Sequence, residues 1–163
     1  MKKILLVNTE YREYGGEDAN IRDELNLLSK NFAVELINFS NKSNNLASIF
    51  SFISSNNYSS NKTLYRKISS FKPDVLYVHN TWFKANLGIF KISKKLNLPT
   101  IVKIHNYRFD CGRFFLKKNH LRGELFCSKC SMTKNDSRYI NKYYKESLIK
   151  SLLLTVYSKR YFN

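Results

Sequence analysis

Proline and glycine are scarce in this sequence. Its 163 residues include two prolines and five glycines, which excludes a collagen-like protein or a low-complexity linker. Hydrophobic residues make up 43% of the chain and aromatic residues 15%, so a disordered tail is excluded as well. A chain of this length is typical of one domain and buries about 70% of its unfolded surface. We therefore expect a single domain over residues 1–163.

Long apolar runs are absent too. No segment reaches the roughly 18 apolar residues that span a bilayer. The first residues look superficially like a signal peptide, but the apolar run Ile4–Val7 is only four residues long, whereas a secretory signal needs about 7–15. We interpret this run as a first strand. The expected location is cytoplasmic, either free or peripheral on the inner face of the membrane.

Acidic residues are also in short supply. The chain has 12 acidic and 28 basic side chains, which give a formal net charge of +16. Residues 1–82 hold 10 basic and 8 acidic side chains, whereas residues 83–163 hold 18 and 4. The basic half favours an anionic partner, namely nucleic acid, an anionic lipid surface or a phosphorylated substrate. The alternative is compositional, since Lys outnumbers Arg 20 to 8 and Asn occurs 19 times, as an AT-rich genome would produce.

What the chain does contain is an alternation of apolar strands and amphipathic helices. The patterns predict strands at residues 4–7, 32–39, 74–79 and 100–105. They predict helices from Glu17 to Leu28, at 63–71, 82–96 and 137–160, and a short one around 46–53. Strands that alternate with helices predict a parallel sheet. The expected fold class is α/β, a Rossmann-like three-layer domain.

Polar residues follow three of the predicted strands. Gly15–Gly16 come after the first strand, His79–Asn80 after the third, and His105–Asn106 after the fourth. Ligands of such folds bind beyond the carboxyl ends of the strands. Histidine at this edge can donate to a phosphate or a hydroxyl, or transfer a proton near neutral pH. Two histidines in equivalent positions favour a function for at least one of them over simple strand capping.

The Gly15–Gly16 step lets the backbone approach a ligand, and the helix that begins there offers N–H groups to a phosphate. Glu17 and Asp18, in the first turn of that helix, would repel an anion. The pair matches neither the dinucleotide fingerprint nor a P-loop, so an ordinary tight turn is the alternative.

The three cysteines lie within a basic loop at residues 106–136. Cys111, Cys127 and Cys130 have the spacing C-x15-C-x2-C, and the second pair has the spacing of zinc ligands. Tetrahedral zinc needs a fourth ligand, which His120 or Asp110 would have to supply. A disulfide, which a reducing cytosol disfavours, and free thiols are the alternatives. Zinc is therefore a weak candidate, and we expect no resident cofactor.

Basic residues and tyrosines alternate from Lys134 to Arg160. This pattern would suit an anionic membrane or a nucleic-acid backbone. A helix with one apolar stripe, formed by Leu148, Leu152 and Val156, and a solvated basic face explains it as well.

Several segments of the chain form an ordered set. They are Val7–Asn8 leading to Gly15–Asp18, Lys72–Trp82, Leu98–Thr100, Lys103–Arg108, and Cys111 followed by the Cys127/Cys130 pair. Taken together, they resemble the N-terminal half of a family 4 glycosyltransferase of the two-Rossmann (GT-B) type. The resemblance covers essentially the whole chain.

In that family the N-terminal domain mainly binds the acceptor, and the C-terminal domain binds the nucleotide-sugar. The resemblance implies that Gly15 and Gly16 face the donor phosphates and the acceptor, and that His105 lines the catalytic cleft with Asn106 and Arg108 close by. It also implies a glycan or lipid-linked acceptor and no catalytic metal. With the two strand-end residues, the expected substrate- and phosphate-binding set is Gly15, Gly16, His79, Asn80, Asn106 and Arg108.

The chain also departs from the family. Family members are about twice as long, and their second domain carries two glutamates with seven residues between them, a pattern that these 163 residues lack. We therefore expect an acceptor-side half that is inactive without a separate donor-binding subunit. A truncated gene and a stand-alone binding module are the alternatives. The competing class, a nucleic-acid-binding module, is favoured by charge alone, because no helix-turn-helix or aromatic RNP signature is present.

Overall fold

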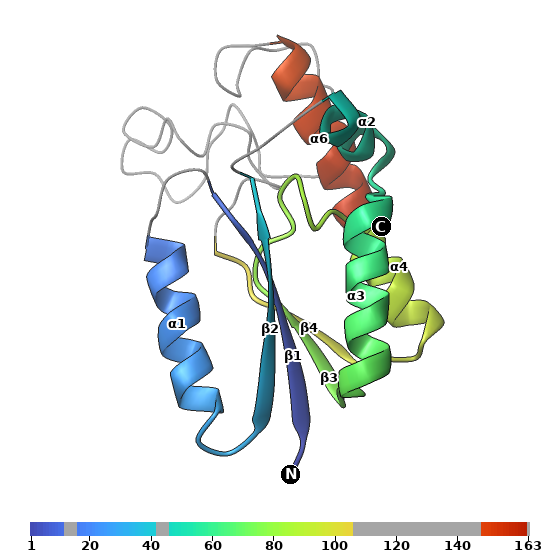
Figure 1. Cartoon of the computed structure of the whole chain (residues 1–163). Helices are drawn as coiled ribbons and strands as arrows, with labels where there is room; N and C mark the ends of the chain where they lie inside the picture. The colour runs from blue at the N-terminus through green and yellow to red at the C-terminus, as the bar shows by residue number, and fades with distance from the viewer. Residues whose placement is uncertain (12–15, 42–45, 106–147, 163) are drawn as a thin grey trace. The chain divides into compact units, whose positions relative to one another are not determined.

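The computed structural model describes residues 1–11, 16–41, 46–105 and 148–162 (Figure 1). It divides the chain into two units, Met1–His105 and Asn106–Asn163. The first unit contains a sheet and its covering helices, and the described part of the second is the helix α6 (Leu148–Phe162). That the two units act as one domain stays a prediction.

The sheet of the first unit has four strands, all parallel. These are β1 (Lys3–Glu10), β2 (Ala33–Ser40), β3 (Val75–Val78) and β4 (Thr100–Val102), in the spatial order β2-β1-β3-β4. The predicted α/β fold with a parallel sheet is therefore confirmed. The long apolar run of β1 places that strand in the middle of the sheet, where both of its faces are covered.

Helices cover both faces of this sheet and complete three layers (Figure 1). The helix α1 (Gly16–Leu28) lies along one face, and α3 (Tyr58–Phe71) and α4 (Gly88–Lys95) lie along the other, whereas α2 (Leu46–Ser54) precedes α3. The predicted starts of α3 and α4 were wrong. The helix α3 begins five residues before the expected start, because Asn57 caps it there, with its side chain accepting a hydrogen bond from the Ser60 N–H. The residues before α4 form turns instead, with positive φ at Phe83 and Asn86.

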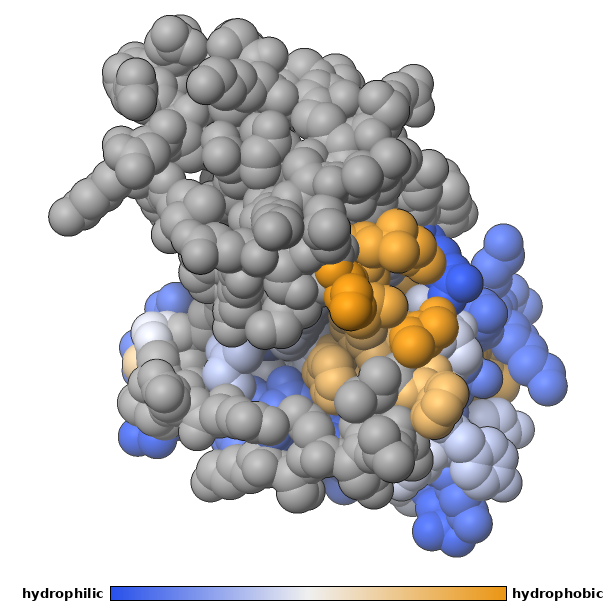
Figure 2. Space-filling view, turned by 90° about the horizontal axis from the view of Figure 1, so that it is seen from above, coloured by the Kyte–Doolittle hydropathy of each residue, from blue (hydrophilic) through white to orange (hydrophobic). Residues whose placement is uncertain are grey.

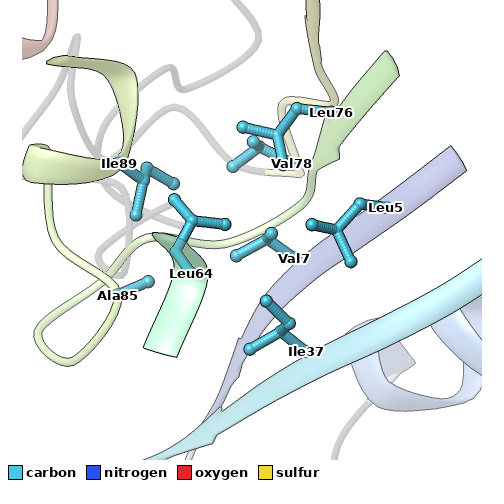
Figure 3. Close-up of a cluster of buried hydrophobic side chains, with 8 residues drawn as sticks. All are labelled: Leu5, Val7, Ile37, Leu64, Leu76, Val78, Ala85 and Ile89. Atoms are coloured by element: carbon cyan, nitrogen blue, oxygen red, sulfur yellow. The ribbon is translucent and has the colours of Figure 1, made fainter. Parts of the chain in front are cut away.

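The hydrophobic core lies between the sheet and the helices α3 and α4 (Figure 3). Alternate strand residues supply one side of it, because successive side chains of a strand point to opposite faces. Each fully buried side chain of this kind stabilises the fold by roughly 1.5–3 kcal/mol. The buried members are Leu5, Val7, Ile37, Leu64, Leu76, Val78, Ala85 and Ile89.

The helix α6 differs from its predicted pattern. Among the α6 side chains that the structure describes, Leu154 and Tyr157 are buried, whereas Leu152 is half exposed, so the predicted place of Leu152 in the apolar stripe was wrong. The first residues of the predicted helix, 137–147, lie outside the described part of the chain. Among the helices that the structure describes, none has the length and apolar character needed to cross a membrane.

Candidate functional site

The site lies at the point of the sheet where the strand order reverses. From β1, the chain goes to β2 on one side, and β3 and then β4 follow on the other side. In open α/β sheets this switch point, at the carboxyl ends of the strands, is where ligands bind. His79 directly follows β3, and His105 comes three residues after β4. The two histidines therefore follow neighbouring strands at one edge of the sheet, but the predicted strand ends at 79 and 105 were wrong, since β3 ends at Val78 and β4 at Val102.

The strand register places four polar residues in one row. Asn8 pairs with Asn38 of β2. Val7 pairs with Val78, and Val78 pairs with Val102, so the residues that follow these three, Asn8, His79 and Lys103, lie at the same level. The ladder continues through this level, because the His79 N–H donates to Val7 O and the Lys103 N–H donates to Val78 O, each at 2.9 Å. We call Asn38, Asn8, His79 and Lys103 the polar row. It lies on the α1 face of the sheet, opposite the apolar core.

The imidazoles of His79 and His105 are in direct contact. Nδ1 of His79 lies 2.9 Å from Nε2 of His105, and the ring centroids are 5.0 Å apart. The His79 side chain is completely buried and also packs against the Tyr77 ring, with centroids 4.6 Å apart. The fold therefore joins two residues that are 26 positions apart into one hydrogen-bonded pair.

A carboxylate completes this arrangement. Oε2 of Glu24, on α1, lies 3.0 Å from Nε2 of His79, and Oε1 accepts a hydrogen bond from Nζ of Lys103. Glu24 Oε2 and His79 Nε2 are both buried, and their close approach is not aligned as a hydrogen bond. Glu24, His79, His105 and Lys103 form what we call the imidazole–carboxylate cluster.

Burial determines the charge of His79. Desolvation, and then the neighbouring His105, lower the pKa of His79 from its ordinary 6.5 to about 4. Desolvation also raises the pKa of the neighbouring Tyr77. Both groups are therefore neutral at pH 7. Neutral His79 acts in this cluster as a hydrogen-bonding group and not as a positive charge.

Asn80, which the sequence predicts as a binding residue, has a structural use. Its amide N–H donates to Thr9 O at 2.8 Å, and its Oδ1 accepts from the Trp82 N–H at 2.9 Å. The Ala85 N–H in turn donates to Thr9 Oγ1. These bonds hold the loop that follows β3 against the end of β1.

Gly16 is the first residue of α1, one residue before the predicted start of that helix. A Cβ added there would meet nothing within 4 Å, so packing does not require a glycine at this position. The other predicted site residues, Gly15, Asn106, Arg108 and the three cysteines, lie outside the described residues. Within the described ranges, no group of three or more His, Cys, Asp or Glu side chains is arranged to hold a metal ion.

The sequence interpretation missed Glu24 and Lys103. Glu24 lies three residues after Ile21 and four before Leu28, so it falls within the apolar stripe of its own helix. Lys103 interrupts the apolar run of the segment predicted as a strand over 100–105. A charged residue at an inward-facing position is the signal that would have found both, because an ionised group is buried only when it is paired.

Apolar side chains are exposed near this edge of the sheet. Figure 2 looks down onto it and shows hydrophobic side chains gathered on one side. In α2, Phe50 and Ile53 are exposed, whereas Phe52 packs against Trp82 and Phe83 with ring centroids about 5 Å apart. The helix α2 is therefore anchored to the loop after β3 and still presents apolar surface to solvent.

No protein-family model, no curated protein and no solved structure matches this chain. A proposal about its function therefore depends on the chain's own residues and on the sequence resemblance given above.

Proposed function

We propose that this chain is the acceptor-side half of a GT-B-type glycosyltransferase, which moves a sugar from a nucleotide-sugar to a glycan or lipid-linked acceptor. The observation that carries the proposal is the contact between His79 and His105 at the switch point of the sheet. His105 is the residue that the sequence resemblance assigns to the catalytic cleft. A paired imidazole at that position is suited to orienting an acceptor hydroxyl.

The chemistry needs two kinds of group at this edge. A new bond forms between the acceptor oxygen and the anomeric carbon, the bond from that carbon to the diphosphate breaks, and the hydroxyl proton leaves. His105 would orient the hydroxyl through a hydrogen bond. The N–H groups of the first turn of α1, which starts at Gly16, would face the departing diphosphate.

Binding of the acceptor is the first test. The full chain would be titrated with a panel of glycans and lipid-linked sugars, and the amide shifts would be followed by NMR. We expect saturable shifts near His105 and a loss of affinity of about tenfold or more in His105→Ala, since that change removes a polar contact with the substrate. Lys67→Ala, on the other face of the sheet, is the matched control. Acceptor affinity that His105→Ala leaves unchanged would contradict the proposal.

A separate donor-binding half is part of the proposal. The 163 residues contain no pair of glutamates with seven residues between them, which the resemblance leads one to expect in a donor site. We expect no sugar transfer from the purified chain alone and transfer when a donor-binding half is co-expressed. Robust transfer by the 163-residue chain would falsify this part.

Peripheral attachment to a membrane is the accompanying proposal, since many lipid-linked acceptors reside there. It is supported by the basic second half of the chain and by the exposed Phe50 and Ile53 of α2. Sedimentation with liposomes is the measurement. We expect binding to anionic vesicles that weakens with salt, and equal binding to anionic and zwitterionic vesicles would rule out the role of charge.

The net charge of +16 supports a second candidate, a module that binds nucleic acid without catalysing a reaction. A titration with duplex and single-stranded oligonucleotides at two salt concentrations separates the two functions. Tight binding at physiological salt with a steep salt dependence would favour this second candidate. Weak binding that does not discriminate between oligonucleotides would favour the glycosyltransferase function over nucleic-acid binding.

A further inference from the structure

The imidazole–carboxylate cluster restricts where its protons lie. Each neutral imidazole carries one N–H, and the other ring nitrogen holds a lone pair. A bare Nε2 of His79 would place its lone pair 3.0 Å from a carboxylate oxygen, in a buried setting where neither atom has an aligned hydrogen bond. That repulsion is expensive at low dielectric, so the proton of His79 belongs on Nε2.

This assignment determines the protonation of His105. With its proton on Nε2, His79 has a bare Nδ1, which accepts a hydrogen bond across the 2.9 Å contact. The donor of that bond is the Nε2–H of His105. A proton of His105 is therefore on Nε2, facing Nδ1 of His79.

We propose that Glu24 is a positioning residue that fixes, through His79, which nitrogen of His105 carries the proton. Lys103 belongs to the same device, because its Nζ donates to Oε1 of Glu24 and so orients the carboxylate. Glu24 contacts His79 but acts on His105 only indirectly, because its carboxylate determines the tautomer of His79. The device thereby determines which nitrogen of His105 donates to His79.

Any role of this tautomer in binding an acceptor rests on the proposed function. The tautomer itself does not rest on it, since it follows from the contacts within the chain. The closing experiment therefore reads the tautomer in the protein without any ligand.

The test is a long-range ¹H–¹⁵N NMR spectrum of the histidine side chains in the full chain, recorded at about pH 7.5, where an ordinary histidine is neutral. Protonated and bare ring nitrogens have well-separated ¹⁵N shifts. In the wild type we expect a protonated Nε2 and a bare Nδ1 for both His79 and His105. A proton on Nδ1 of His105 in the wild type would overturn the proposal.

Glu24→Gln provides a sharper test. Lys103 should hold the amide oxygen of the new side chain, so that the amide NH₂ faces Nε2 of His79. That nitrogen must then accept, and the protons of His79 and His105 should both move to Nδ1. Tautomers that stay unchanged in a folded Glu24→Gln would also overturn the proposal.

Two further variants separate positioning from structure. Lys103→Met keeps a carboxylate at Glu24, both of whose oxygens accept, so we expect the wild-type tautomers to remain. Glu35→Gln makes the same change in the Glu35–Lys67 pair and should leave both histidines untouched. A tautomer exchange in Glu35→Gln would attribute the effect to a general disturbance and contradict the role of Glu24.

The acceptor titration distinguishes the two failures. If the proposed function also holds, Glu24→Gln should weaken acceptor binding by roughly 2- to 10-fold, the change expected from one lost hydrogen bond. The tautomer exchange without any acceptor binding would support the role of Glu24 and contradict the glycosyltransferase. Acceptor binding with no tautomer exchange would support the glycosyltransferase and contradict the role of Glu24.

Discussion

The two faces of the same sheet differ in chemistry. On the face towards α3 and α4, Leu5, Val7, Leu76 and Val78 are completely buried in an apolar core. On the face towards α1 lie Asn8, the residue after Val7 in β1, and His79, the residue that directly follows β3, and both belong to the polar row. One step along a strand therefore separates a residue of the core from a residue of the candidate site. Substitutions at neighbouring positions should consequently affect different measurements.

The largest effect is expected on the apolar face. Leu76→Ala, which truncates a side chain with no exposed surface, should lower the free energy of unfolding by about 2–5 kcal/mol, because it leaves a cavity in the core. Denaturation with urea measures this loss. Leu27→Ala is the control, since Leu27 is 61% exposed and its truncation should change stability by no more than about 0.5 kcal/mol. Equal effects of the two changes would remove the contrast between core and surface.

On the polar face, the next largest effect should depend on pH. Unfolded His79 binds a proton below its ordinary pKa of 6.5, whereas folded His79 does so only below about 4. Between these values the unfolded state holds more protons, so stability rises with pH, is complete above 6.5 and is lost as the pH falls towards 4. The shift corresponds to about 3 kcal/mol.

The measurement is a series of urea unfolding curves between pH 4 and 7 for the wild type and for His79→Gln, which cannot ionise. Glu24, Lys103, His105 and Tyr77 face His79, and the variant keeps all four, so the difference between the two proteins isolates His79. We expect a flatter pH dependence in the variant. Parallel curves for the two proteins would mean that His79 titrates normally.

A substitution of Asn80 tests whether this residue supports the loop after β3 or binds a ligand. Asn80→Ala removes the buried bond to Thr9 O and the partly buried bond from the Trp82 N–H and should cost about 1–3 kcal/mol of stability, since both hydrogen bonds are lost. Asn26→Ala, at an exposed position of α1, is the matched control and should be nearly neutral. A stable Asn80→Ala protein that has lost acceptor binding would restore the binding role that the sequence predicts.

The smallest effect is expected for a partly exposed ion pair between α3 and β2. Lys67 Nζ lies 2.5 Å from Glu35 Oε2, and both side chains are 38% exposed. Lys67→Ala should therefore lower the free energy of unfolding by no more than about 1 kcal/mol, and salt should reduce this loss. Urea curves at low and high salt check it. A loss above about 2 kcal/mol would indicate that this pair is coupled to the core.

Much of the fold could be predicted from the sequence. The apolar runs around Val7 and Val78 lie in strands, and the helix that follows Gly16 was expected in nearly the right place. The errors occur where local signals compete. Residues 82–87 look helical in their spacing, yet Asn86 holds the turn there, with its Nδ2–H donating to Ser51 O and its Oδ1 accepting from the Leu87 N–H. The bond to Ser51 depends on the position of α2, and the hydrophobic periodicity of residues 82–87 carries no information about that position.

The candidate site was predictable only in part. His79 and His105 were chosen because they end predicted strands, and the structure brings them into contact. Glu24 was missed, because its place within the apolar stripe of α1 is a local signal but nothing local identifies its partner. Lys103, with which it pairs, is 79 positions away in the sequence.

The sequence by itself determined that this chain alternates strands and helices and that two histidines follow its strands, because hydrophobic periodicity reports local burial. Only the tertiary structure decided that those histidines meet and that Glu24 lies against them. Contacts of this kind follow from the order β2-β1-β3-β4 and from the strand register, which are properties of the assembled sheet and of no single segment.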